Sequence, residues 1–297
     1  MDIVWTLLGV VLIGLALRDI FDVLFHPLGR GTITRRVVGG MAALARQAPR
    51  GETGTLGLLV GPLSYIAVVG TWAALLAIGW ALVFLPQLPQ GFNFDPQLDP
   101  AAHSGFLDAL YVSLVNLTSL GYGDISPAAS LLRILGPVET LFGLGLLTAS
   151  ISWLLSIYGA ISRRDSLAHE VHLAKQAEER LGEKLAEADP ELLETLLAGF
   201  AEQLIRTRRD LIHFPIVHYF RTEDEERALA GLLPFLGSLV DEAGEESRPH
   251  SLRVRAEILR MAIDDFAETL RKRLKMPGET TDETLRHYQS DHGALGA

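Results

Sequence analysis

The sequence predicts an all-α membrane protein, in which an apolar first half with membrane-spanning helices precedes a polar, helical second half. Residues 1–159 contain 7 basic and 9 acidic side chains, whereas residues 160–297 contain 19 and 27. No Lys or Arg occurs between Glu52 and Arg133. Such an asymmetry is typical of a membrane domain that is followed by a soluble one.

Composition excludes several classes of function. The 297 residues carry a formal net charge of −10, which argues against a chain that coats nucleic acid, because phosphate binding needs clustered Lys and Arg. The chain has no Cys, so a disulfide framework, Cys-ligated zinc and a thiol nucleophile are excluded. The sequence contains no group of polar residues with the spacing of a known active site. We therefore expect neither an enzyme nor a cofactor.

The first predicted transmembrane helix is the N-terminal segment, residues 1–26. Its apolar run covers residues 3–17, and a helical pattern continues to Phe25, with Arg18 and Asp22 four residues apart on one face. A signal peptide needs a basic leader and a small-residue cleavage site, which this segment does not offer. We therefore favour a retained span over a cleaved or merely interfacial segment.

Two further spans are predicted at residues 57–85 and 131–162. The first is a run of 29 residues without a charge. It is long enough to cross a hydrocarbon core of about 30 Å at about 1.5 Å per residue, with tilt to spare. In the second, residues 134–162 contain a single charged side chain, Glu139. Both segments therefore meet the length and polarity that a membrane span requires.

Basic residues in the short loops predict the orientation. Residues 27–56 contain five Arg and one acid, Glu52, and Arg163 and Arg164 follow the last span, so both places are expected in the cytoplasm. Residues 86–109 contain three Asp and no basic group, so they are expected outside. The prediction is a multi-pass protein of the cell (inner) membrane with an external N-terminus and a cytoplasmic C-terminus. Part of the basic loop is expected to lie along the inner surface as an amphipathic helix in contact with lipid.

Between the last two spans lies a segment that is too short to cross the bilayer. Residues 106–117 are compatible with a helix, and in the residues that follow, Gly121 and Gly123 permit φ values closed to other residues. Non-helical backbone at membrane depth survives only where it is buried in protein or lines a water-filled path. We therefore predict a re-entrant loop whose carbonyl groups need partners, and a dehydrated cation is the obvious one.

The residues of this loop resemble the T-V-G-Y-G signature of the potassium channel family, most closely its small prokaryotic members with two spans. The matching run is Thr118-Ser119-Leu120-Gly121-Tyr122-Gly123-Asp124. The resemblance covers residues 57–162 and implies an ion channel pore domain. Its predicted parts are an outer helix (57–85), a pore helix (105–118), a filter (119–124) and an inner helix (131–162). Before it lie residues 1–26 and a basic loop (27–56), and after it a cytoplasmic helical domain (163–297).

The resemblance implies a homotetramer in which backbone oxygens replace the hydration shell of potassium, the permeant ion. The residues implied to form the ion-binding filter are Ser119, Leu120, Gly121, Tyr122 and Gly123, with potassium bound at the first four. Ser119 keeps the hydroxyl of the family's Thr, and Leu120 replaces a Val whose carbonyl does the coordinating.

Four residues are predicted to support the filter: Thr118, Asp124, Tyr111 and Glu139. Some family members carry a carboxylate in the pore helix where this chain has Val115, so its coupling to Asp124 is absent here. Glu139 lies inside a span, where an ionisable residue is a functional hypothesis by default. Bracing the pore helix is the role that we prefer for Glu139, and snorkelling towards the outer surface is the alternative.

The last span resembles the inner helix that lines the cavity of the family and closes at its cytoplasmic end. Gly143 falls where the family has a hinge glycine, and close packing between membrane helices is the alternative role. Leu144, Leu147 and Ile151 match cavity-lining positions and would make an apolar vestibule. No span carries Arg or Lys at every third position, so a voltage sensor of the usual kind is not expected.

Residues 163–297 are predicted to form the cytoplasmic helical domain. A seam that begins at Leu167 and Val171 recurs at heptad spacing and would extend the inner helix as a short coiled coil. Asp189, followed by Pro, is a good helix start. The tail after Glu279 is polar and is predicted to be disordered.

The cytoplasmic half offers no nucleotide-binding or metal-binding motif. No G-x-G-x-x-G follows a strand pattern, so the nucleotide-fold regulatory domain of many prokaryotic channels is not expected. His213 and His218 flank a proline and are expected to be packing residues rather than ligands. A regulatory ligand or protein partner of this half is not identified by the sequence.

Three functional hypotheses remain. The leading one is a potassium-selective channel that conducts passively through the filter. The first alternative keeps the pore but relaxes it to a non-selective cation channel through Ser119 and Leu120. The second alternative is a non-conducting membrane sensor or scaffold that acts through the cytoplasmic helices.

Overall fold

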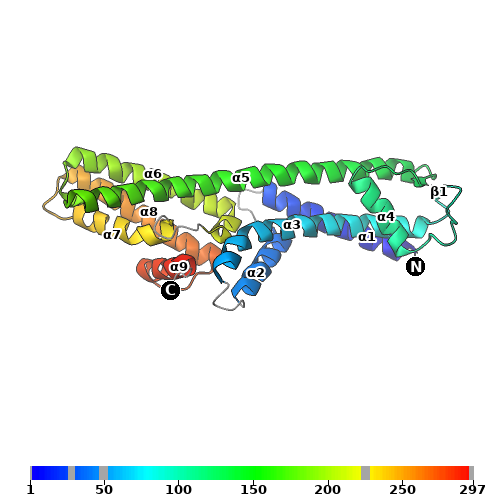
Figure 1. Cartoon of the computed structure of the whole chain (residues 1–297), viewed down its shortest axis with the longest axis horizontal. Coiled ribbons are helices and arrows are strands. Elements are labelled where there is room, and N and C mark those ends of the chain that lie inside the picture. The colour runs from blue at the N-terminus through cyan, green and yellow to red at the C-terminus, as the bar shows by residue number, and fades with distance from the viewer. Residues whose placement is uncertain (1, 26–30, 47–52, 222–227, 294–297) are drawn as a thin grey trace. The chain divides into compact units, whose positions relative to one another are not determined.

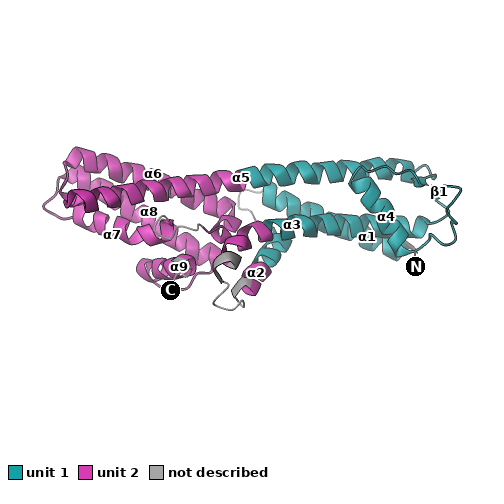
Figure 2. Ribbon diagram, in the orientation of Figure 1, with its two compact units in different colours: residues 1–38, 65–155 teal, residues 39–64, 156–297 magenta. Residues whose placement is uncertain are grey.

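The computed structural model describes residues 2–25, 31–46, 53–221 and 228–293, and these are almost entirely helical (Figure 1). The chain divides into two compact units, residues 1–38 with 65–155 and residues 39–64 with 156–297 (Figure 2). The predicted all-α class is confirmed. The part that the sequence did not predict is a small antiparallel pair of strands, β1 (Phe92–Phe94) and β2 (Ile125–Pro127).

The first unit contains α1 (Asp2–Leu24), the beginning of α2 (Thr32–Arg46) and most of α3 (Thr53–Phe84). Asp19 of α1 is only 3% exposed and holds these three helices together. Its carboxylate accepts hydrogen bonds from the backbone N–H groups of Ile33 and Thr34 at 2.7 and 3.1 Å. It also accepts from the Thr34 hydroxyl at 2.7 Å and from Nε1 of Trp72 at 2.9 Å. Asp19 thus satisfies N–H groups at the start of α2, which have no partner inside their own helix.

Two helices in the described part of the chain are long and apolar enough to cross a membrane, Gly57–Gln87 and Leu132–Leu181. The first contains the second predicted span, and the other covers the third from its second residue onward. The helix α1 covers the segment for which a first span is predicted, and Arg18 and Asp22 lie 3.8 Å apart on it as the spacing indicates. The predicted interfacial helix coincides largely with α2, and the remainder of the basic loop lies partly outside the described residues.

A short helix, α4 (Phe106–Leu117), and the first part of the long helix α5 (Leu132–Leu181) complete the first unit. The strand β1 comes before α4 and β2 comes before α5. The strands pair in the register Phe92 to Pro127, Asn93 to Ser126 and Phe94 to Ile125. The segment between α4 and β2, residues 118–124, is therefore fixed at both ends by regular structure.

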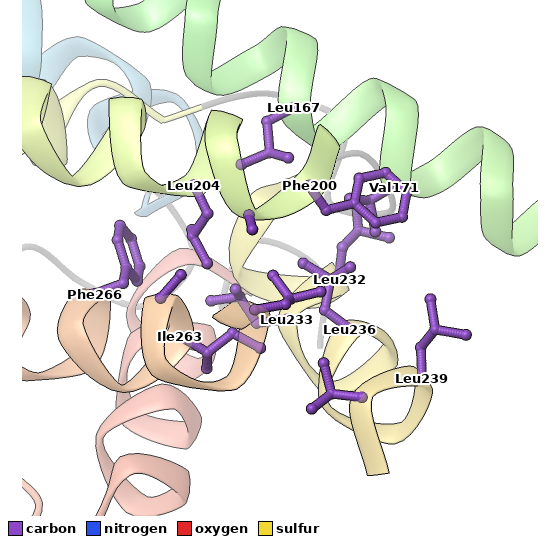
Figure 3. Close-up of a cluster of buried hydrophobic side chains, with 14 of the residues drawn as sticks. Leu167, Val171, Phe200, Leu204, Leu232, Leu233, Leu236, Leu239, Ile263 and Phe266 are labelled. Atoms are coloured by element: carbon purple, nitrogen blue, oxygen red, sulfur yellow. The ribbon is translucent and has the colours of Figure 1, made fainter. Parts of the chain in front are cut away.

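The second unit is a helical bundle. It consists of the second half of α5, α6 (Pro190–His213), α7 (Leu229–Ala243), α8 (His250–Leu274) and α9 (Thr281–Gly293), with short 3-10 turns at η2 (Leu185–Glu187) and η3 (Pro215–Tyr219). Figure 3 shows side chains from α5, α6, α7 and α8 converging on one apolar core. Asp189 caps α6 as predicted, because its side chain accepts hydrogen bonds from the N–H groups of Glu191 and Leu192.

The seam on the second half of α5 packs within its own chain. Leu167 and Val171 are fully buried in the core of Figure 3, which α6, α7 and α8 complete. Leu181, the last residue of α5, is 73% exposed. The start of the predicted coiled coil is therefore already covered by this chain, and an interchain role is left as a prediction for the last turn alone.

The prediction of disorder after Glu279 is wrong for residues 281–293, which form α9. Its mostly polar sequence conceals a short stripe of contacts, in which Thr284, Tyr288 and His292 are buried. Glu283 accepts hydrogen bonds from the N–H groups of Glu279 and Thr280, which stabilises the start of the helix. Average polarity is a poor guide here because three or four well-placed side chains are enough to dock a helix of this length.

Candidate functional site

The backbone between α4 and β2 alternates between ordinary and left-handed conformations. Ser119, Gly121 and Gly123 have φ values of 60°, 63° and 79°. The left-handed region costs an L-residue roughly 1–2 kcal/mol, whereas glycine occupies it freely. Two of the three positions are glycine, and Ser119 bears the strain. Strained backbone of this kind clusters at functional sites, so the loop is the first candidate in this unit.

The two ends of the loop are held by side chains that the sequence singled out. Thr118 donates a hydrogen bond from its hydroxyl to the Leu114 carbonyl at 2.6 Å, which closes the last turn of α4. The Tyr111 hydroxyl donates to Oδ2 of Asp124 at 2.6 Å. The Asp124 carbonyl in turn accepts from the N–H of Asp95, at 2.8 Å, next to the strand pair. Asp124 therefore ties the loop both to α4 and to the strands.

The Glu139 carboxylate on α5 joins α4 to the long helix. Glu139 is completely buried, and it accepts hydrogen bonds from the Ser113 hydroxyl at 2.5 Å and from Nδ2 of Asn116 at 3.1 Å. The Ser113 hydroxyl also lies 3.0 Å from the carbonyl of Ala77 on α3. Thr140 strengthens the contact, because its hydroxyl donates to the Asn116 carbonyl at 2.9 Å. Glu139 thus faces α4 rather than the outer surface.

Gly143 lies where α5 passes against the end of α4. A Cβ atom placed on Gly143 would be only 1.9 Å from the carbonyl oxygen of Leu117. The glycine is therefore needed for close approach, and α5 continues through it as one helix. Gly145 has open space around it within the chain. The structure gives Gly143 a packing role, while the proposed hinge stays a prediction.

The remaining predicted site residues are exposed on the single chain. In the loop, Leu120 is 57% and Tyr122 is 67% exposed. On α5, Leu144, Leu147 and Ile151 are 49%, 59% and 51% exposed. Large exposed apolar areas on a single chain mark surfaces that contact lipid or other chains. This chain brings Tyr111, Asp124 and Glu139 to the loop and to α4, and leaves these five for lipid or for other chains to cover.

Sequence reasoning missed Ser113 and Asn116, which are the partners of Glu139. A signal was present, since they are three residues apart and are the polar side chains that interrupt the apolar run of α4 between Asp108 and Thr118. Residues three apart share a helix face, and a polar pair on such a face needs a partner. Asp19 was missed for a different reason: its donors come from α2 and α3, and no local pattern relates them.

Comparison with known proteins agrees with this arrangement. Residues 70–159 match the family described as ion channel. The chain is also similar to the uncharacterized membrane protein YdjJ of Bacillus subtilis (strain 168), with 24% identity over 282 residues, which is 91% of this chain and 79% of the relative. No solved structure matches the chain.

The family match spans the end of α3, the strand pair, α4, the strained loop and the first part of α5. The relative extends the similarity over nearly the whole chain and is itself a membrane protein by name. The fold, the apolar helices and these two matches agree with one another. The chain is an all-α membrane protein whose residues 70–159 are similar to an ion channel domain.

Proposed function

We propose that this protein is a potassium-selective channel, in which the loop of residues 119–123 from each of four copies forms the filter. The observation that carries the proposal is the alternation of left-handed residues at Ser119, Gly121 and Gly123. A backbone in which every second residue is left-handed can turn successive carbonyl groups to the same side. A row of such oxygens is what replaces the hydration shell of potassium in a selective pore.

The support around the loop fits the same function. Selectivity depends on small differences in coordination energy, so a filter needs neighbours that fix its backbone. In this chain Thr118 and the Tyr111–Asp124 hydrogen bond hold the ends of the loop, and Glu139 holds α4. In the proposal, α4 is the pore helix, and its C-terminal end carries the negative end of the helix dipole towards a cation.

A homotetramer follows from the proposal, since one chain supplies one loop and four are needed to surround an ion. The exposed side chains of Leu120 and Tyr122 would then be covered by neighbouring copies. Leu144, Leu147 and Ile151 would face the cavity on the axis. The N-terminus would lie on the external side of the membrane and residues 163–297 on the cytoplasmic side, as the distribution of Arg predicts.

Ion flux from purified protein in liposomes tests the proposal. Potassium flux is expected, with sodium flux at least about tenfold lower, which corresponds to about 1.4 kcal/mol of difference in binding. Equal fluxes of the two ions would replace the proposal with a non-selective cation channel. No flux of either ion, from protein that is folded and tetrameric, would favour the sensor or scaffold.

The oligomeric state is a second, independent test. Cross-linking of the protein in membranes is expected to proceed to a tetramer. Saturation at a dimer would contradict the filter, because two loops cannot enclose an ion.

A further inference from the structure

Two histidines lie buried against each other in the second unit. His218 belongs to η3 and His292 to α9, and Nδ1 of the first lies 3.3 Å from Nε2 of the second. Their ring centroids are 4.9 Å apart, and the planes are nearly perpendicular. Tyr288, one turn before His292 on α9, packs on both rings with centroids at 5.9 and 4.6 Å. This cluster of three rings is the contact through which α9 meets η3.

Among the described residues, the charged groups around the pair are mostly basic. Arg164 on α5 and Arg221 after η3 both act electrostatically on the two histidines. Asp165 on α5 is the acidic side chain among them, and its carboxylate forms an ion pair with the guanidinium group of Arg164 at 3.0 Å. In the part of the chain that the structure describes, the other titratable neighbours are the phenols of Tyr288 and of Tyr219, whose ring centroid lies 5.1 Å from that of His218. The neighbouring side chains from α7 and α8 are apolar: Leu229, Ala230 and Phe266.

This environment favours the uncharged pair. Burial, aided by Arg221 and Arg164, lowers the pKa of His218 from 6.5 to about 3. Burial and the charge of His218 lower the pKa of His292 well below 6.5. In the uncharged pair one ring donates an N–H to the bare nitrogen of the other. Protonation of one ring would place a buried positive charge beside the two arginines. Protonation of both rings would leave no acceptor nitrogen between them, because each imidazolium carries N–H groups on both of its nitrogens.

The same turn contacts the first part of α3 and the middle of α5. Phe220, directly after η3, packs so closely on α3 that a Cβ atom on Gly61 would lie 2.6 Å from its ring. Its ring also meets Tyr158 of α5 edge to face, with centroids 6.3 Å apart. Arg164 of α5 is buried and donates hydrogen bonds to the carbonyls of Val217 and Phe220 at 3.2 and 2.8 Å. The turn that carries His218 is thus clamped between α3 and α5.

We propose that the His218–His292 contact is a proton-binding site, through which acidification on the side that holds the second unit releases α9 and loosens Phe220 from α5. The consequence for conduction rests on the proposed channel function, since α5 is the proposed inner helix. Loss of the clamp frees α5 to move, so acid is expected to raise potassium flux. The release of α9 itself does not depend on conduction.

The direction with pH follows from proton linkage. Both histidines have a lowered pKa when α9 is docked, chiefly because they are buried. Release of α9 exposes the rings to water and returns each pKa towards the ordinary value of 6.5. The released form therefore binds more protons, and docking is at full strength above pH 6.5 and weakens as the pH falls from 6.5 towards 3. Between pH 7.5 and pH 5.5 each histidine weakens docking by about tenfold, and the two together by about 100-fold.

Hydrogen exchange of the full chain in lipid nanodiscs measures docking directly. Protection factors, which remove the intrinsic effect of pH on exchange, report local opening of α9. The amides of α9 are expected to lose about 100-fold in protection between pH 7.5 and pH 5.5, while those in the middle of α6 stay unchanged. Constant protection of α9 over this range would overturn the proposal.

Variants separate the pair from other titrating groups. The double variant His218→Phe with His292→Phe keeps two packed rings but removes both titratable groups. The protection of α9 should then no longer depend on pH. His292→Gln leaves His218 as the one titrating ring of the pair, so the loss of α9 protection between pH 7.5 and pH 5.5 should be about tenfold instead of about 100-fold. His169→Gln changes an exposed histidine of α5 and is the matched control, which should keep the full response. A full response in the double variant would overturn the proposal.

Flux from the same preparations tests the coupling. Potassium flux in liposomes is expected to rise at least about threefold when the side of the second unit is brought to pH 5.5, and the double variant should abolish the rise. If α9 is released but flux does not change, the coupling through Phe220 is refuted. If the parent conducts no ions at any pH, the channel function fails, and the exchange result still decides the proton site.

Discussion

Helix α5 has two stretches that are covered in different ways. In its second stretch, Leu167 and Val171 are fully buried by helices of the same chain. In its first stretch, Leu144, Leu147 and Ile151 are about half exposed or more. The helical bundle thus completes its apolar core alone, whereas the part that is similar to an ion channel domain leaves apolar side chains for lipid or further copies to cover. Bundle stability is a property of one chain, and in the proposed channel the function of the loop is a property of an assembly.

The largest effect on conduction is expected at the loop. Gly123→Ala places a side chain on a residue with φ of 79°, which costs on the order of 1 kcal/mol or more. Because about 1.4 kcal/mol is a tenfold change in binding, the preference for potassium over sodium should fall by about tenfold or flux should cease. The measurement is paired potassium and sodium flux, with cross-linking to verify that the tetramer persists. A variant with the selectivity of the parent would show that this loop is not the filter.

Gly143 sharpens the comparison within α5. Gly143→Ala forces a methyl group against the Leu117 carbonyl, so the end of α4 must shift, at a cost of about 1–3 kcal/mol. We expect both gating and selectivity to change, because the loop begins directly after α4. Gly145→Ala is the matched control in open space and should change neither. Altered open probability with unchanged selectivity would instead restore the hinge role.

The bundle should respond as a closed core does. Leu236 is fully buried, and Leu236→Ala is expected to cost about 2–5 kcal/mol and to lower the thermal midpoint of the second unit by roughly 5–15 °C. Leu147→Ala, at a position 59% exposed, should leave that midpoint unchanged and act on conduction instead. Circular dichroism and flux measured on both variants check the contrast. Equal losses of stability would show that the two stretches of α5 are not separable.

The last contrast lies within α1, at Asp19, and concerns stability alone. Asp19→Asn keeps the shape of the side chain but replaces one accepting oxygen with an NH₂ group. At least one of the donors to Asp19 then loses its acceptor, which is expected to lower the free energy of unfolding by about 1.5–3 kcal/mol. Asp22→Asn is the matched control, since its partner Arg18 is 78% exposed and 3.8 Å away. The midpoint temperature of thermal unfolding, measured in detergent, should fall for Asp19→Asn and hardly change for Asp22→Asn. Equal behaviour would mean that α2 does not depend on its contact with α1.

Local pattern in the sequence was enough for several features. The uncharged runs determined the two apolar helices, since crossing a membrane needs length and low polarity and nothing from a distant residue. The glycine pattern at Gly121 and Gly123 predicted left-handed backbone in the loop, and both residues have it. Asp189 before a proline determined the start of α6 by the same kind of short-range chemistry.

The tertiary structure alone decided the contacts between distant residues. The partners of Glu139 lie 23 and 26 residues away, and those of Asp19 are 14, 15 and 53 residues away. The His218–His292 contact spans 74 residues, and the polar sequence of α9 concealed it. A buried polar group takes whichever partner the packing of helices brings within about 3 Å. Sequence periodicity determines which face a side chain lies on, and only the assembled fold decides what that face meets.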